Sequence, residues 1–155
     1  MVLFKHTREK KRFKQYRLEV KSEINALDEV LNWFILIVEK RLPQKCGWQC
    51  QLALAEAFTN TVRYAHKDLP ESTPILIELN LLPNTAEIRI YDYGAPFDLQ
   101  GKLRSLKLMN GDSLERESDR GLLFIQKLTD NVESLRLLGN LNCLIMRKMV
   151  INSES

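Results

Sequence analysis

Apolar residues recur along this chain with two different periods, and these periods predict its strands and helices. A loose alternation over residues 15–20 predicts a first strand. Spacing by three and four residues predicts a helix over residues 24–42, with Ser22 as its N-cap and Pro43 just past its end. After a break, the same spacing predicts a second helix at about residues 48–66.

Two pairs of alternating runs predict β-hairpins. Residues 75–82 and 86–91 are separated by a Pro-Asn turn. Residues 132–138 and 141–150 are separated by Gly139-Asn140, a pair suited to positive φ angles. Because these links are short, the strands they join must pair antiparallel.

The segment between the two hairpins is long for a connection. Residues 93–120 offer at most one or two helical turns, near residues 103–109, and a short helix is expected over residues 121–128. The order of elements predicts an α+β fold, a two-layer sandwich of a mainly antiparallel sheet with helices on one face. We expect a single domain over residues 15–150, followed by a short tail at 151–155.

The first predicted helix carries more apolar residues than one sheet face requires. Val30, Trp33 and Ile37 form a second stripe beside the main one. We interpret this stripe as a surface for a partner or for a second copy, so a homodimer is expected.

Composition and charge exclude several classes of protein. The 155 residues are 45% hydrophobic and 28% charged, which excludes a disordered or collagen-like chain. The longest apolar run, residues 33–38, is far too short to span a bilayer, and the charged start does not suit a signal peptide, so we expect a cytoplasmic protein without membrane contact. Three cysteines do not suggest a disulfide framework.

The net charge of +3 is concentrated at one end of the chain. Residues 1–14 carry six basic residues and one acidic residue, which leaves the rest at −2. We interpret this segment as a mobile, solvated basic arm rather than as a nucleic-acid contact.

Three polar patches stand in a fixed order on the predicted elements. Residues 56–60 (Glu-Ala-Phe-Thr-Asn) lie on the second helix, residues 92–98 (Asp-Tyr-Gly-Ala-Pro-Phe-Asp) end a strand, and residues 119–122 (Asp-Arg-Gly-Leu) open a helix. Together they resemble the N, G1 and G2 boxes of the GHKL ATP-binding fold, also called the Bergerat or histidine-kinase-like ATPase fold. The resemblance is greatest to the anti-sigma serine kinases and spans about residues 15–148.

The resemblance implies a role for each residue of the first two boxes. Asn60 would bind Mg²⁺ through its amide oxygen beside the phosphates of ATP or ADP. Glu56, one turn earlier on the same helix face as Asn60 and Arg63, would accept the proton of an attacking hydroxyl. Asp92 is an acceptor suited to the adenine amino group, and Gly94 would let the backbone approach the base.

The remaining site residues follow from the same resemblance. Pro96 belongs to the second box, while Gly121 and Leu122 are expected at a helix N-terminus whose free N–H groups favour phosphate, with added charge from Arg120. Where the family tends to carry Thr near the adenine-binding Asp, Asn142 could supply the hydrogen bond. Lys102 is interpreted either as a lid charge facing phosphate or as an ordinary surface lysine.

Ser118 and Asp119 depart from the pattern, because the family usually places two glycines there. A stiffer lid with an added negative charge should weaken nucleotide binding or slow closure. Two simpler interpretations also apply nearby: His66 is expected to be a helix-end residue close to the site, and Cys46 with Cys50 a packing pair rather than a zinc site.

Two functional hypotheses follow. The first is an anti-sigma-type serine/threonine protein kinase that binds ATP and Mg²⁺, holds a sigma factor and phosphorylates a serine on an antagonist protein. The second is a non-catalytic partner-switching module of the same fold, whose output is protein binding with or without nucleotide. A histidine-kinase fragment and a DNA-binding protein are weaker alternatives.

Overall fold

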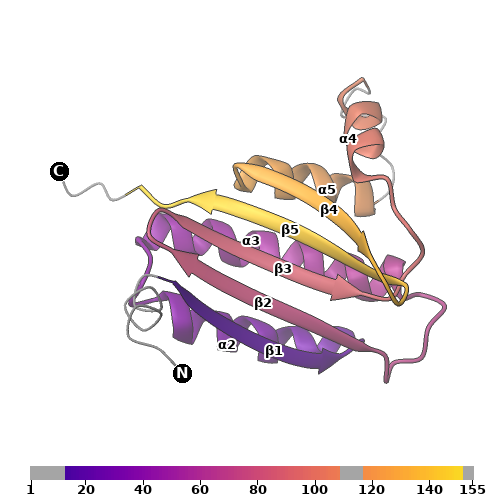
Figure 1. Cartoon of the computed structure of the whole chain (residues 1–155), viewed down its shortest axis with the longest axis horizontal. Coiled ribbons are helices and arrows are strands. Elements are labelled where there is room, and N and C mark those ends of the chain that lie inside the picture. Colours follow the sequence, from indigo (N-terminus) through magenta and orange to yellow (C-terminus); the bar gives the residue numbers. More distant parts are fainter. Residues whose placement is uncertain (1–12, 109–116, 152–155) are drawn as a thin grey trace.

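The computed structural model describes residues 13–108 and 117–151, and these form one five-stranded sheet with helices packed on one face (Figure 1). The strands pair antiparallel throughout, in the order β1-β2-β3-β5-β4. The predicted α+β class is confirmed. In chain order the elements are β1 (Lys14–Lys21), 3-10 helix η1 (Ile24–Ala26), α2 (Leu27–Val38), α3 (Gln44–Asn60), π-helix η2 (Thr61–Ala65), β2 (Pro74–Leu82), β3 (Thr85–Asp92), α4 (Leu99–Lys107), α5 (Glu117–Leu128), β4 (Asn131–Leu137) and β5 (Leu141–Met149).

Both predicted hairpins are present. Leu82 pairs with Thr85 at the end of the β2–β3 hairpin, and Leu137 pairs with Leu141 at the end of β4–β5. The loop between Leu137 and Leu141 has three residues, 138–140, one more than predicted, and its Gly139 and Asn140 have positive φ angles of 81° and 60°. The two hairpins therefore follow from local turn chemistry together with alternation, whereas the β1–β2 and β3–β5 pairings join distant segments.

The hydrophobic core lies between the sheet and helices α2, α3 and α5, which Figure 1 shows together behind the strands. Val30 and Phe34 of α2 and Leu54 and Phe58 of α3 are fully buried. Burial of an aliphatic or aromatic side chain contributes about 1.5–3 kcal/mol, so these helices are held mainly by their apolar faces.

The second apolar stripe predicted for self-association is mostly core. Val30 and Ile37 are buried within the chain itself, and Trp33 packs against the same core in a partly buried position. The prediction was wrong because α2 contacts both the sheet and α3, so a wide sector of the helix is covered.

Helix boundaries differ from the predicted ones at several places, and α2 ends at Val38 rather than near residue 42. Ser22 does not cap the first helix, since Glu23 is the N-cap residue of η1. The second helix begins at Gln44, directly after Pro43, rather than at Trp48. The last part of the predicted helix, Thr61–Ala65, is the π-helix η2, and the N–H of His66 donates to the carbonyl of Thr61.

The long connection after β3 contains more helix than predicted. Helix α4 spans nine residues, begins with Asp98 as its N-cap, and buries Leu99, Leu103 and Leu106. In Figure 1 it stands at the edge of the molecule beside the start of α5. Among the described residues, no helix is long and apolar enough to cross a membrane.

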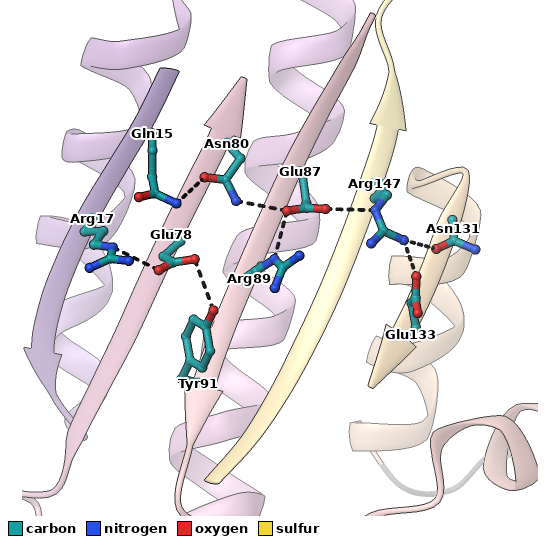
Figure 2. A network of polar contacts seen from close by, with 10 residues as sticks. All are labelled: Gln15, Arg17, Glu78, Asn80, Glu87, Arg89, Tyr91, Asn131, Glu133 and Arg147. Atoms are coloured by element: carbon teal, nitrogen blue, oxygen red, sulfur yellow. Dashed lines mark hydrogen bonds and ion pairs between the residues drawn. The ribbon is translucent and has the colours of Figure 1, made fainter. Parts of the chain in front are cut away.

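The face of the sheet opposite the helices carries a chain of polar contacts across all five strands (Figure 2). At its centre, the Glu87 carboxylate accepts from Asn80 Nδ2 at 2.9 Å, Arg89 Nε at 2.8 Å and Arg147 Nε at 2.9 Å. Arg147 also contacts Glu133 of β4. Further members of this network are Gln15, Arg17, Glu78, Tyr91 and Asn131.

Candidate functional site

The predicted catalytic and metal-binding residues meet where α5 packs against the last turns of α3. A Cβ atom added to Gly121 would lie 2.7 Å from Glu56 Oε2 and 3.3 and 3.4 Å from the amide nitrogen and oxygen of Asn60. The two polar groups therefore converge on one point. A side chain at position 121 would force the Glu56 carboxylate to move away from this point.

A surface cavity of about 450 Å³ opens beside this point. Its lining includes Glu56, Arg63, Glu117, Arg120 and Gly121, so four predicted site residues share it. Arg63 Nη1 lies 2.7 Å from Glu117 Oε1, an exposed ion pair that joins η2 to α5. Two arginines and two glutamates thus line the cavity, and one arginine is paired with one glutamate.

One sequence prediction about this region was wrong. The free N–H groups of a helix belong to its first turn. Helix α5 begins at Glu117, so Gly121 and Leu122 lie beyond that turn and are not at the helix N-terminus. Arg120 is also inside the helix and is exposed, whereas the Leu122 side chain is part of the core. The acidic residues Glu117 and Asp119 in the first turn were the signal for the earlier start.

Asp92 is the centre of a second group of contacts, at the end of β3. Its Oδ1 accepts from the N–H of Gly94 at 2.8 Å and from Asn142 Nδ2 at 3.0 Å. Asn142 also donates to the carbonyls of Gly94 and Ala95 at 3.0 and 3.1 Å. Asn142 thus lies within hydrogen-bond distance of Asp92, and the antiparallel register places these two residues opposite each other.

Sequence reasoning missed Arg136. Its Nη1 donates to the carbonyl of Gly94 at 3.1 Å and to Asn142 Oδ1 at 3.0 Å. Arg136 lies opposite Asn142 in the β4–β5 hairpin, so its place depends on the strand register. A single arginine on an exposed strand carries no local signal of such a role.

The turn that contains Gly94 packs tightly on the end of η2. A Cβ atom at Gly94 would lie only 2.7 Å from the carbonyl oxygen of Ala65. His66 follows directly, and its Nε2 accepts from the backbone N–H of Tyr93 at 2.9 Å. The expectation that His66 ends the helix near the site is confirmed, and η2 connects the two groups of site residues.

Asp119, one of the two departures from the glycine pattern, has a partner. Its Oδ1 lies 3.1 Å from Lys102 Nζ, and its side chain is only 11% exposed. This ion pair joins α4 to α5 two residues before Gly121. Lys102 therefore neutralises the carboxylate that the sequence places near the expected phosphates.

The oxygen atoms of Asn60 and Glu56 are suited to a magnesium ion whose other ligands are phosphate oxygens and water. In residues 13–108 and 117–151, no group of three or more His, Cys, Asp or Glu side chains could hold a metal. One amide oxygen beside a carboxylate fits Mg²⁺, which commonly takes one or two protein ligands and completes its shell with phosphates and water. Asn60 would supply the amide oxygen, with the Glu56 carboxylate beside it, and the missing Cβ of Gly121 leaves space near both.

The predicted residues thus form two groups rather than one. Glu56, Asn60, Arg63, Arg120 and Gly121 gather between α3 and α5, whereas Asp92, Gly94 and Asn142 gather between β3 and β5. Pro96 is exposed in the loop after β3, and Leu122 is buried in the core.

Comparisons with known proteins agree with this architecture. The family model of the histidine kinase-like ATPase domain matches residues 20–148. The serine-protein kinases RsbW of Listeria innocua and Listeria monocytogenes are 29% and 31% identical to this chain over 86 residues. That match covers 54% of the chain and about half the length of these relatives. The crystal structure of the SiaB-SiaC complex from Pseudomonas aeruginosa contains a chain of similar fold, with a TM-score of 0.58, 16% identity and 94% of each chain covered.

Proposed function

Because this chain belongs to the family of histidine kinase-like ATPase domains, we propose that it is a regulatory serine/threonine protein kinase of the anti-sigma type. In this role it binds ATP and Mg²⁺ in the cytoplasm, holds a sigma factor and phosphorylates an antagonist protein on serine, and so regulates transcription. The observation that carries the proposal is the convergence of Glu56 and Asn60 at Gly121. The similarity to RsbW proteins, which are named serine-protein kinases, supports the same reaction.

The residues of the site have distinct tasks in this reaction. Bound ATP and Mg²⁺ supply the phosphoryl group and neutralise its charge. The Glu56 carboxylate accepts the proton of the serine hydroxyl. At the same time the serine oxygen bonds to the γ-phosphorus, and the bond between that phosphorus and the ADP oxygen breaks. Asn60 holds the metal, and the guanidinium groups of Arg63 and Arg120 add positive charge at the cavity.

Adenine recognition falls to the second group of residues. Oδ1 of Asp92 already accepts from Gly94 and Asn142, so the adenine amino group would bind at Oδ2. The contacts of Asn142 and Arg136 with the carbonyl of Gly94 keep this turn in one conformation before nucleotide arrives.

Replacement of Glu56 by Gln tests the kinase proposal. The variant keeps the shape of the side chain but cannot take up the proton, so we expect ATP binding to persist while phosphate transfer falls by about 10²- to 10⁴-fold. Transfer is measured with radiolabelled ATP and a panel of candidate antagonist proteins, and binding by calorimetry.

Two further variants control this experiment. Glu29→Gln, on the exposed side of α2, should behave as wild type in both assays. Asn60→Ala should lose Mg²⁺-dependent nucleotide binding. Transfer by Glu56→Gln at the wild-type rate would remove Glu56 from the chemistry.

A non-catalytic partner-switching module is the second candidate, and one observation favours it. The Lys102–Asp119 ion pair ties α4 to α5 where the family has flexible glycines, which restricts closure over a nucleotide. A wild-type protein that binds ATP but labels no antagonist would support this candidate.

A homodimer is also part of the proposal. Leu36 of α2 and Trp48 of α3 are 71% and 62% exposed, and Trp48 lines an apolar groove of about 790 Å³ between these helices. Exposed apolar side chains of this size are suited to a protein partner.

A further inference from the structure

His66 is buried and contacts two separate parts of the chain. Its Nδ1 lies 3.0 Å from the hydroxyl of Ser22, directly after β1, and its Nε2 lies 2.9 Å from the backbone nitrogen of Tyr93, directly after β3. Only 2% of its surface is exposed. The imidazole therefore links the end of an edge strand to the turn that carries Asp92 and Gly94.

These contacts determine which nitrogen carries the proton. A backbone N–H can only donate, so Nε2 must be the acceptor toward Tyr93. The proton of a neutral imidazole then resides on Nδ1, which donates to the oxygen of Ser22. A doubly protonated ring would place two N–H groups against each other at Tyr93.

The π-helix η2 orients this side chain. The N–H of His66 donates to the carbonyl of Thr61, five residues earlier, at 2.8 Å. The wider π-turn changes the direction in which the next residue leaves the helix, and such turns are frequent at functional sites. Ala65, in the same turn, contacts the position of Gly94.

We infer that His66 is a positioning residue for nucleotide binding, which holds the Asp92–Gly94 turn through the N–H of Tyr93 only while its imidazole is neutral. This inference rests on the proposed nucleotide site, and it adds a dependence of affinity on pH. Acidification converts the acceptor at Nε2 into a donor, releases Tyr93 and disturbs the turn that presents Asp92.

The surroundings of His66 favour the neutral ring. Burial lowers the pKa of His66 below its usual value, and the negative charge of Asp92 partly opposes this change. Ser22 and the backbone of Tyr93, which face the ring from its two other sides, carry no charge. A lowered histidine pKa means that the ring is still neutral at pH 6.5 and that the positioning contact is lost only as the pH falls through the lowered value.

The test compares wild type with His66→Gln in calorimetric titrations with ADP and Mg²⁺ from pH 7.5 to 5.0. Glutamine can present Oε1 to Tyr93 but does not titrate, so it keeps the acceptor at every pH. The phosphates of ADP also titrate in this range and affect both proteins equally. The quantity compared is therefore the dissociation constant of wild type divided by that of His66→Gln at each pH. We expect the wild type to weaken relative to His66→Gln as the pH falls through the lowered pKa of His66, by up to about ten-fold once the ring is protonated, which corresponds to the loss of one buried hydrogen bond.

A second measurement does not require nucleotide. In protein labelled with ¹⁵N-tyrosine, the amide signal of Tyr93, assigned with Tyr93→Phe, should move with pH in the wild type and stay constant in His66→Gln. His6→Gln, at the other histidine of the chain, is the matched control and should follow the wild type in both experiments.

The outcomes separate this inference from the proposed function. If nucleotide binds and the ratio of dissociation constants is the same at all pH values, or the Tyr93 signal titrates equally in His66→Gln, His66 has no positioning role. If neither protein binds nucleotide even at pH 7.5, the proposed function fails and this role with it.

Discussion

Asp92 shows how much of the site depends on the geometry of a single side chain. Its Oδ1 accepts two hydrogen bonds from the chain itself, one from Gly94 and one from Asn142. These contacts fix the orientation of the carboxylate, so Oδ2 is presented in one direction. Recognition of a base edge needs this fixed geometry more than it needs negative charge.

Replacement of Asp92 by Asn should weaken ADP binding by about 1–3 kcal/mol while the fold remains intact. The amide oxygen can keep the contacts with Gly94 and Asn142, but the amide nitrogen then faces the adenine amino group donor to donor. Calorimetry on wild type, Asp92→Asn and the exposed control Asp68→Asn measures the effect. Equal affinities in all three would remove Asp92 from the pocket.

At the scale of elements, the relation between α4 and α5 decides how open the site is. Lys102 and Asp119 pair across these helices, and Gly121, just beyond the first turn of α5, lies beside Glu56 and Asn60. Because Asp119 is largely buried, loss of its partner would leave an uncompensated negative charge near the expected phosphates.

Substitutions at the two ends of this ion pair should therefore act in opposite directions. Asp119→Gly restores a flexible residue and removes the carboxylate, so nucleotide should bind several-fold more tightly. Lys102→Ala leaves the carboxylate unpaired and should weaken binding, whereas Lys107→Ala, exposed on the same helix, is the control. Equal affinities for all of these proteins would show that the ion pair does not restrict the site.

At the scale of the whole molecule, one polar network connects all five strands on the face without helices (Figure 2). Glu87 is its centre, with hydrogen bonds from Asn80, Arg89 and Arg147. Burial by itself would raise the pKa of Glu87, but these hydrogen bonds hold the pKa below its usual value. A depressed carboxyl pKa means that ionised Glu87 stabilises the fold.

Glu87→Gln should lower the free energy of unfolding by about 1–3 kcal/mol at pH 7, because a charged acceptor becomes a neutral amide. Stabilisation by a carboxylate with a depressed pKa is complete above its unfolded pKa of about 4.3 and is lost as the pH falls through the folded value. The difference between wild type and Glu87→Gln should therefore shrink below pH 4. Urea unfolding at several pH values measures it, with the exposed Glu19→Gln as control. A difference independent of pH would exclude the ionised carboxylate as its source.

The sequence alone determined the features that depend on local chemistry. Alternation and the turn residues Gly139 and Asn140 predicted the hairpins, and three- and four-residue spacing predicted the long helices, because period and turn conformation are properties of short segments. The spacing of Glu56 and Asn60 placed both on one helix face for the same reason. The boxes that carry the family resemblance are likewise continuous in the chain.

Only the tertiary structure decided which of these segments meet. Val30 and Ile37 belong to the core because α2 packs on two neighbours, and no periodicity reveals a second neighbour. Strand register brings Arg136 to the Asp92–Gly94 turn, and the π-turn brings His66 to it. Asp119 pairs with Lys102 on a helix that precedes it in the chain. These contacts join residues far apart in sequence, and the free energy that selects them is gained only when the layers pack together.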